Sequence, residues 1–232
     1  MFCRPSLPAF RSFLAVSALV AVALPSQAEE VCGTPDSTGV TLCSAGLPAD
    51  RVQQLAVVQE QPQWCWAASI SMIFAHHGFA VRQEDIVKDG YGGVAANLPA
   101  PSGQAMTKAL SKAWVDGNAK PFQGHAVASD SHAGRFQVSE HKVLAELADG
   151  RPLLLGAQRH AVVLVELKYE RSERGNVRIL GGTVIDPRPG VGVRPLTVGE
   201  MKPTYVAAVQ VMGDGERVAA AEVARDTAAV LH

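Results

Sequence analysis

Cysteines are few in this sequence, and no two of them are closely spaced. The four cysteines, Cys3, Cys32, Cys43 and Cys65, include no Cys-x-x-Cys pair, which is the usual arrangement of structural zinc ligands. A charge excess of one sign is also missing, because 21 basic residues stand against 22 acidic ones, and this argues against a nucleic-acid partner. There is no internal repeat and no long linker rich in Pro, Gly or Ser, so we expect one folded domain.

One apolar run stands out, and it lies at the amino terminus. Arg4 and Arg11 precede the uncharged run Phe13–Leu24, and Ser26-Gln27-Ala28 is a small-x-small cleavage site. This pattern predicts a secretory signal peptide over residues 1–28; the alternative is a buried helix. Its removal reduces the basic residues from 21 to 19, so the formal charge changes from −1 to −3. We expect a bacterial protein that is secreted or periplasmic and has no membrane contact after signal removal, since no second stretch of spanning length follows.

The cysteine count of the exported chain is odd. Cys3 leaves with the signal peptide, and three cysteines remain in an oxidising compartment. Cys32 and Cys43 flank a loop rich in Gly, Pro, Ser and Thr, so their pairing is the economical one and leaves Cys65 as a thiol. Three free thiols, or a bridge that includes Cys65, are the alternatives. We therefore predict an amino-terminal segment, residues 29–50, with a disulfide loop.

Cys65 begins an uncharged apolar stretch in the string QEQPQWCWAASISMIFAHHG, residues 59–78. Residues 66–74 are apolar or small, which predicts a helix buried on most sides, and Gly78 is suited to end it. Pro62 keeps the preceding segment extended, so Cys65 falls in the first helical turn. Unpaired N–H groups and the helix dipole favour a thiolate there. The plainer interpretation is a buried cysteine between two tryptophans.

The local string resembles a known family. Gln59, five residues and then Cys65-Trp66-Ala67 at the start of a long helix is the arrangement of papain-like cysteine peptidases. The longer pattern Gln-x-x-x-x-Trp-Cys-Trp-Ala-Ala is similar to the bacterial branch that includes secreted effector peptidases of plant pathogens. The resemblance covers about twenty residues. It implies a catalytic domain over residues 51–212, followed by an Ala-rich tail at 213–232 to which we assign no function.

A nucleophilic thiol needs a general base, and imidazole titrates in the right range. His76 and His77 lie at the far end of the predicted helix, about 15 Å from Cys65, and so cannot reach it. His160 stands before the apolar run AVVLV, where an unpaired polar ring would be costly. The spacing of 95 residues from Cys65 to the string HAVVLV also resembles the family. His160 is therefore the predicted base; the alternative is a hydrogen-bonded histidine at a strand edge.

Two further residues complete the predicted site. Asp186 ends the string TVID before Pro187, and it would orient the imidazole. Papain-like peptidases use Asn here, whereas the bacterial branch often has Asp before Pro; an ordinary turn residue is the alternative. Gln59 has the family spacing for an oxyanion-hole donor that acts with the Cys65 N–H. Gln61 and Gln63 are the alternatives in this glutamine-rich loop.

The rest of the chain predicts an α+β fold. Short helices are expected from Gln83 to Lys88, after Ser102 with a stripe of Met106, Leu110 and Trp114, and after Ser139 with an end at Gly150. Residues 117–137 are polar and are predicted to be irregular. From Arg151 onward, short apolar runs predict antiparallel strands, with a charged hairpin tip between Leu167 and Ile179. Helices first and sheet second give a papain-like order, in which a helical lobe packs on a twisted antiparallel sheet.

These expectations define a function. The resemblance implies a cysteine endopeptidase that needs no metal or organic cofactor, acts on a protein or peptide substrate and is a monomer. The alternatives are a thiol-dependent amidase or acyltransferase of the same fold, because the same residues serve other amides, and an inactive binding module.

Overall fold

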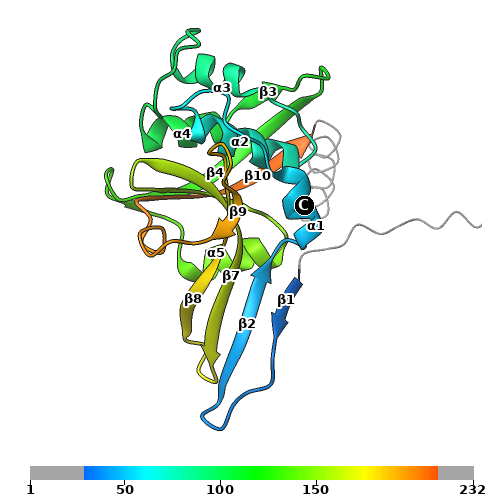
Figure 1. Cartoon of the computed structure of the whole chain (residues 1–232), viewed down its shortest axis with the longest axis vertical. Helices are drawn as coiled ribbons and strands as arrows, with labels where there is room; N and C mark the ends of the chain where they lie inside the picture. Colours follow the sequence, from blue (N-terminus) through cyan, green and yellow to red (C-terminus); the bar gives the residue numbers. More distant parts are fainter. Residues whose placement is uncertain (1–28, 214–232) are drawn as a thin grey trace, which may run out of the picture.

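One antiparallel sheet with a hydrophobic core on each face organises the protein (Figure 1). The computed structural model describes residues 29–213, which form five helices and ten strands. The helices are α1 (Ala49–Leu55), α2 (Cys65–His76), α3 (Gln83–Gly90), α4 (Gly103–Leu110) and α5 (Glu140–Ala148). The strands are β1 (Glu29–Cys32), β2 (Val40–Gly46), β3 (Ala113–Val115), β4 (Pro121–Asp130), β5 (Arg135–Phe136), β6 (Leu153–Ala157), β7 (His160–Ser172), β8 (Val177–Asp186), β9 (Gly192–Pro195) and β10 (Tyr205–Gly213). The predicted signal peptide and the tail beyond Gly213 lie outside the described residues.

The sheet has the strand order β1-β2-β7-β6-β10-β4-β3. Strand β7 is its centre: β6 and β2 pair with successive parts of one edge of β7, while β8 pairs with the other edge and carries β9. Side chains alternate between the faces along each strand. Ala161, Val163 and Val165 of β7 join the core that contains α2, whereas Val162 and Leu164 join the core that contains α5. Helix α2 and helix α5 therefore cover opposite faces of the sheet.

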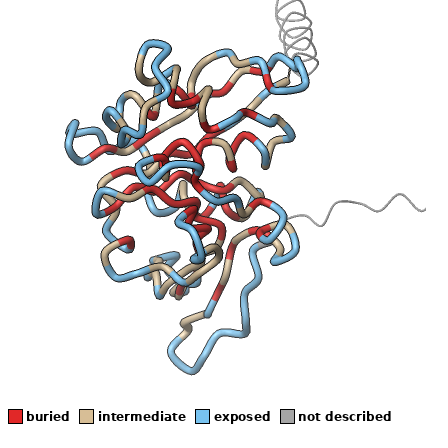
Figure 2. Tube along the Cα trace, turned by 45° about the horizontal axis from the view of Figure 1, so that its top comes forward, coloured by how far each residue is buried: buried red, intermediate tan, exposed pale blue. Residues whose placement is uncertain are grey.

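Helix α2 is buried on most of its surface because nearly all of its side chains are apolar or small. Residues from Trp66 to Phe74, apart from Ser71, are buried between the sheet, α3 and the strand β3–β4 region. The helix ends at His76, and Gly78 follows with φ of +86°, a conformation that glycine adopts without strain. Figure 2 shows the buried residues gathered in the middle of the molecule.

The α+β prediction is confirmed, with the helix that carries Cys65 packed against an antiparallel sheet. The predicted Cys32–Cys43 disulfide is also present, and Cys65 is free. Ser102 and Ser139 cap α4 and α5 by accepting the N–H of Ala105 and Lys142. The charged hairpin tip is the turn 173–176 between β7 and β8.

Three sequence-based expectations are wrong. Strands β1 and β2 precede the helices, so the order is not helices first and sheet second. Residues 117–137 are not irregular, because β4 pairs along its length with β10, and this pairing rather than local propensity makes it a strand. Trp114 is not helical: α4 ends at Leu110, and Trp114 lies in β3, where its ring still packs 5.8 Å from the ring of Phe74.

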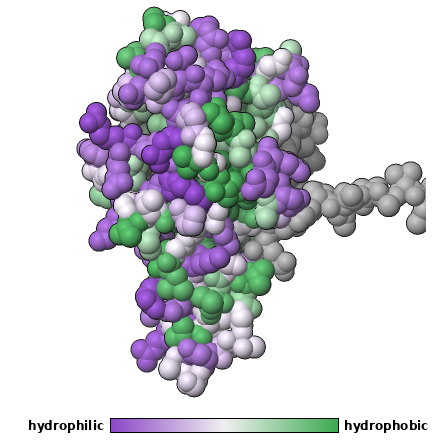
Figure 3. All heavy atoms as spheres, viewed as in Figure 1, coloured by the Kyte–Doolittle hydropathy of each residue, from purple (hydrophilic) through white to green (hydrophobic). Residues whose placement is uncertain are grey.

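The disulfide joins β1 and β2 in an arm at one edge of the sheet, where Cys43 is buried in the core that contains α5. Cys32 and Cys43 face each other in the β1–β2 ladder, and β2 continues the sheet beside β7. In Figure 1 these strands and the β7–β8 hairpin extend below the body of the molecule. Val31 and Leu42 are more than half exposed in this arm, and Figure 3 shows hydrophobic side chains along it as well as near the middle of the same face.

Candidate active site

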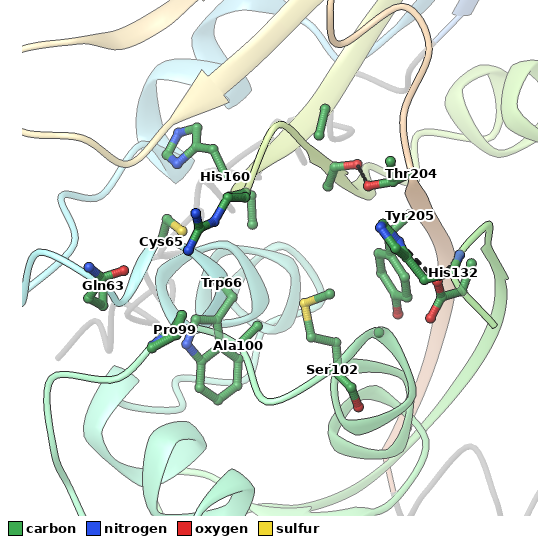
Figure 4. A pocket seen from close by; sticks show the side chains of 17 residues that line it. Gln63, Cys65, Trp66, Pro99, Ala100, Ser102, His132, His160, Thr204 and Tyr205 are labelled. Atoms are coloured by element: carbon green, nitrogen blue, oxygen red, sulfur yellow. Dashed lines mark hydrogen bonds and ion pairs between the residues drawn. The ribbon is translucent and has the colours of Figure 1, made fainter.

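Cys65 is the first residue of α2, and the two tryptophans beside it fix the surrounding loops. Trp64 and Trp66 are buried, and their indole N–H groups donate to the carbonyls of Ala96 and Leu98 at 2.9 and 3.4 Å. The Trp-Cys-Trp string therefore anchors the segment after α3 against the start of α2. This segment continues into Pro99 and Ala100, which line a pocket next to Cys65 (Figure 4).

His160 is the first residue of β7, directly after a two-residue hairpin turn. The turn residues Gln158 and Arg159 have φ of 50° and 62°, a region that non-glycine residues rarely adopt. Turns of this kind match the twist of antiparallel strands, and here the register pairs Ala157 with His160. The tight turn therefore places the imidazole at the end of the β6–β7 hairpin, and Figure 4 shows it beside Cys65.

The structure brings His160 and Asp186 together. His160 Nε2 lies 2.8 Å from Asp186 Oδ1. This contact leaves Nδ1 as the ring nitrogen available to the thiol. Cys65 and His160 line the same pocket of about 370 Å³, and no direct hydrogen bond joins them among the described residues. The pocket thus contains a thiol and an imidazole whose far side is held by a carboxylate.

Two arginines also bind the Asp186 carboxylate, whose side chain is 0% exposed. Arg188 donates from its backbone N–H to Oδ1 at 3.0 Å and from its guanidinium to Oδ2 at 2.7 Å. Arg194 donates to Oδ2 from Nε and Nη2 at 2.9 and 2.7 Å. Burial alone would raise the pKa of Asp186, but the hydrogen bonds from Arg188, Arg194 and His160 outweigh it and hold the pKa well below its usual range. Asp186 is therefore an anion at any pH near neutrality.

The thiol differs from the expectation of a thiolate favoured by the helix terminus. Burial raises the pKa of the Cys65 thiol, and the Asp186 carboxylate adds to the increase. The N–H groups of Ala161, Trp66 and Cys65 itself lower that pKa, as expected at a helix start, but they do not offset burial. Release of the thiol proton therefore needs an acceptor, and the imidazole that lines the same pocket is placed to be one.

Gln59 is buried beside this site but does not line the pocket. Its Nε2 donates to the carbonyls of Gln61 and Pro62 at 2.9 and 2.7 Å, and its Oε1 is buried without a hydrogen bond. Its backbone N–H donates to the Pro187 carbonyl at 2.8 Å, which ties the glutamine loop to the corner after Asp186. Gln63, one of the alternatives, does line the pocket (Figure 4). In this structure both amide hydrogens of Gln59 are engaged within its own loop.

Several residues around the site were not anticipated from the sequence. Gln83 braces the loop on both sides of Gln59, since it accepts the Glu60 N–H at 3.0 Å and donates to the Val58 carbonyl at 2.9 Å. Arg188 follows Asp186 by two residues, and that close spacing of opposite charges was the available signal. Arg194 gave no such local signal, because its contact depends on the β8–β9 pairing.

Four other histidines do not line the pocket. His76 and His77 are at the opposite end of α2, His125 is exposed in β4, and His141 is exposed on α5. Among residues 29–213, no group of three or more His, Cys, Asp or Glu side chains is placed to hold a metal ion. In the same range, no helix is long and apolar enough to cross a membrane.

An α+β fold in which a helix presents a free thiol to a histidine–aspartate pair is the arrangement of a cysteine hydrolase. Residues 49–188 match the Peptidase_C39 like family, and the chain belongs to this family of the papain-like cysteine peptidase clan. No curated protein matches the chain.

Two solved structures are similar in part. One is a double glycine motif protease from an AMS/PCAT transporter in complex with the leader peptide, at 16% identity and a TM-score of 0.37, over 66% of this chain and 89% of that one. The other is the peptidase domain of Streptococcus ComA, a bi-functional ABC transporter involved in a quorum sensing pathway, at 14% identity and a TM-score of 0.39, over 67% of this chain and 96% of that one.

Proposed function

We propose that this protein is an exported cysteine peptidase that hydrolyses peptide bonds through an acyl-enzyme. The observation that carries the proposal is the His160–Asp186 hydrogen bond at 2.8 Å beside a free thiol in one pocket. A thiol whose pKa is raised by burial is a weak nucleophile until a base removes its proton. His160, with Nε2 bound to Asp186, presents Nδ1 for that purpose.

The proposed reaction has two stages. His160 takes the proton of Cys65, the sulfur bonds to the substrate carbonyl carbon, and the resulting imidazolium gives its proton to the leaving amine as the C–N bond breaks. His160 then takes a proton from water, whose oxygen attacks the thioester and releases the carboxylate and the Cys65 thiol. Asp186 holds the imidazole in one orientation and stabilises the imidazolium throughout.

The oxyanion of the tetrahedral intermediate needs donors as well. The Cys65 N–H and the Gln59 amide are the proposed pair. For Gln59 this role requires that one amide hydrogen leave the Gln61 or Pro62 carbonyl when substrate binds. We expect Gln59→Ala to lower kcat by about a hundredfold, the order lost with an oxyanion donor, and to change KM little. Gln63→Ala is the matched comparison, and a larger loss of kcat in that variant would assign the donor to Gln63.

The thiol itself can be tested without knowledge of the substrate. A thiol-directed peptidyl electrophile should modify Cys65, with the site read by mass spectrometry after digestion. Cys65→Ala should abolish labelling, and His160→Ala should slow it strongly. Absence of labelling in a folded protein would favour the inactive binding module. Labelling without hydrolysis of any peptide would favour the amidase or acyltransferase of the same fold.

Export of the protein is part of the proposal, and the signal-like sequence of residues 1–28 supports it. The resemblance of the string around Cys65 to secreted effector peptidases supports a substrate outside the cytoplasm. The mature protein should begin at Glu29 and read EEVCG on amino-terminal sequencing. Recovery of the functional protein with Met1 still present would contradict this.

A further inference from the structure

The pocket that contains Cys65 and His160 extends to a second, chemically different end. Figure 4 shows Cys65 and His160 on one side of the pocket, Trp66 in the middle, and Tyr205 with His132 on the opposite side. Between the two ends the lining includes the apolar side chains of Trp66, Met106 and Ala157, and Arg159 is the cationic residue of the same pocket. The far end contains Asp130, the last residue of β4.

Asp130 has one oxygen in use and one without a hydrogen bond. Its side chain is 10% exposed. Oδ1 accepts the backbone N–H groups of His132 and Ala133 at 3.0 and 3.4 Å, and the His132 ring lies 3.8 Å from the same oxygen. Oδ2 accepts no hydrogen bond from any residue in the range 29–213, and no Lys or Arg there forms an ion pair with Asp130. Oδ2 is not fully buried, so a donor that enters the pocket can reach it.

The surroundings keep Oδ2 close to the backbone of α4. A Cβ added to Gly103 would lie 2.1 Å from Oδ2, so glycine is required for the carboxylate to occupy this place. Next to it, the Tyr205 hydroxyl and the Thr107 Oγ1 are 2.9 Å apart. Apolar walls that lead to an anionic end suit a ligand with an aliphatic stem and a cationic head.

We propose that Asp130 forms a subsite for a lysine or arginine side chain of the peptide substrate. The stem of that side chain would lie along Trp66, Met106 and Ala157, and its cation would donate to Asp130 Oδ2. This inference rests on the proposed peptidase function, because it requires a peptide that passes Cys65. It assigns the substrate class as peptides with a basic residue within a few positions of the scissile bond.

The subsite can be tested by binding to the Cys65→Ala variant, which cannot turn the peptide over. A peptide series places lysine, norleucine or glutamate at one position at a time, and Kd is measured for each. Norleucine keeps the aliphatic stem and lacks the charge. At one position lysine should bind at least tenfold more tightly than norleucine, glutamate should bind worst, and high salt should reduce the difference.

Asp130→Asn in the same background is the specific variant, because Asn keeps the oxygen that accepts the His132 and Ala133 N–H groups. It should remove the lysine preference and leave norleucine binding unchanged; Asp50→Asn, an exposed site on α1, is the matched control. Equal binding of lysine and norleucine, or a preference that survives Asp130→Asn, would overturn the subsite. Electrophile labelling of wild-type Cys65 tests the peptidase separately, so a labelled enzyme without the preference loses only the subsite.

A second inference comes from a different set of contacts. Arg194, which binds Asp186, is itself held by Glu200: its Nη1 and Nη2 donate to Oε2 and Oε1 at 2.8 and 2.6 Å. Glu200 is buried, and it accepts the Thr197 N–H and hydroxyl at 2.8 and 3.0 Å. Both residues lie after the family match, which ends at residue 188. We infer that Arg194 and Glu200 act as positioning residues, which hold Asp186 so that His160 faces Cys65.

The titratable and charged groups around the His160–Asp186 pair determine how its pH profile responds to substitution. They are Cys65 at the start of α2, Arg159 in the β6–β7 turn, Arg188 after β8, Arg194 in β9 and Glu200 after β9. Arg194→Met removes a positive charge next to Asp186, so both limbs of the kcat/KM pH profile should move to higher pH. Glu200→Gln leaves the Arg194 charge less balanced, so both limbs should move to lower pH.

The pH profiles of the two variants should thus move in opposite directions. Residues that only supported the fold would lower kcat and leave both limbs of the pH profile where they are in the wild type. We expect kcat/KM to fall about fivefold to twentyfold in each variant, with partial recovery in Arg194→Lys. Unmoved limbs in both variants would overturn the inference. Glu200→Gln keeps the shape of the site, so it provides the test even where Arg194→Met does not fold.

Discussion

The two ends of helix α2 place polar groups in opposite settings. At its start, Cys65 faces His160, and that imidazole is hydrogen-bonded to a buried carboxylate. At its end, no carboxylate of residues 29–213 forms an ion pair with His76 or His77, and the Glu146 carboxylate acts on His77 only through its charge. Burial lowers the pKa of each to about 4, with Arg51 adding to the effect on His76, and with His76 and Arg151 adding to it on His77. The comparison shows that burial together with nearby positive charges favours the neutral imidazole at the end of α2, and that the imidazole at its start differs by having a carboxylate partner.

The largest loss of activity is expected from removing the two groups at the start of α2. Cys65→Ala and His160→Ala should each reduce kcat/KM to background, because the proposed reaction lacks a nucleophile or a base without them. The double variant should be little worse, since residues that act together are not additive. Circular dichroism should show an unchanged fold. His141→Ala, an exposed histidine on α5, is the control and should keep wild-type activity; a similar loss there would contradict the assignment.

The second prediction concerns Asp186, the carboxylate that is present at the start of α2 and has no counterpart beside His76 and His77. Asp186→Asn should cost roughly tenfold to a hundredfold in kcat/KM, because an amide oxygen can still accept the imidazole N–H. Asp186→Ala should be worse, and both limbs of its pH profile should move to lower pH, since the imidazole and the Cys65 thiol both lose a nearby negative charge. Arg188 and Arg194 would also lose their common partner, so we expect a fall in melting temperature. Wild-type kcat/KM in a folded Asp186→Ala would make Asp186 a turn residue.

Much of this arrangement could be predicted from local sequence. The uncharged run after Cys65 predicts a buried helix, and an apolar β-branched run after His160 predicts a buried strand, because each pattern lies within one element. Strand β4 could not be predicted, since the string PFQGHAVASD has weak strand propensity and becomes a strand by pairing with β10. The Arg194–Glu200 contact was missed for a similar reason, because it arises from the β8–β9 register and the loop that follows.

The third prediction concerns how His76 and His77, at the carboxyl end of α2, make the stability depend on pH. The folded protein holds His76 and His77 neutral to about pH 4, whereas the unfolded chain binds protons from about pH 6.5 downward. Their contribution to the free energy of unfolding is therefore complete above pH 6.5 and is lost as the pH falls toward 4. We expect a loss of several kcal/mol for the pair, with about 7 kcal/mol as the upper limit, measured by urea unfolding.

The matched variant for this measurement is His76→Gln with His77→Gln, which keeps an N–H donor and cannot take up a proton. Its free energy of unfolding should change less than that of the wild type between pH 6.5 and 4. Its catalytic pH profile, measured above pH 5.5, should match that of the wild type. An equal loss of stability in both proteins would show that other groups cause the acid sensitivity.

The smallest effect concerns the arm, which touches neither end of α2. The Cys32–Cys43 bridge closes a loop with a sequence separation of 11, for which loop-closure entropy gives about 3 kcal/mol. That value is a ceiling here, because β1 has four residues and pairs with one strand, β2. Apart from this pairing, Glu30 of β1 binds Tyr169 and Arg171 of β7, and these contacts are at the edge of the sheet, so β1 can detach while the rest of the sheet stays folded. Cys32→Ser with Cys43→Ser should therefore lower Tm by only a few degrees, and kcat/KM should stay within about twofold of wild type. A tenfold loss of activity would contradict this expectation. It would mean that disorder in the arm displaces His160 through the pairing of β2 with β7. Protection of the β1 amides from hydrogen exchange separates these outcomes, since local detachment removes it in the variant while the α2 amides stay protected.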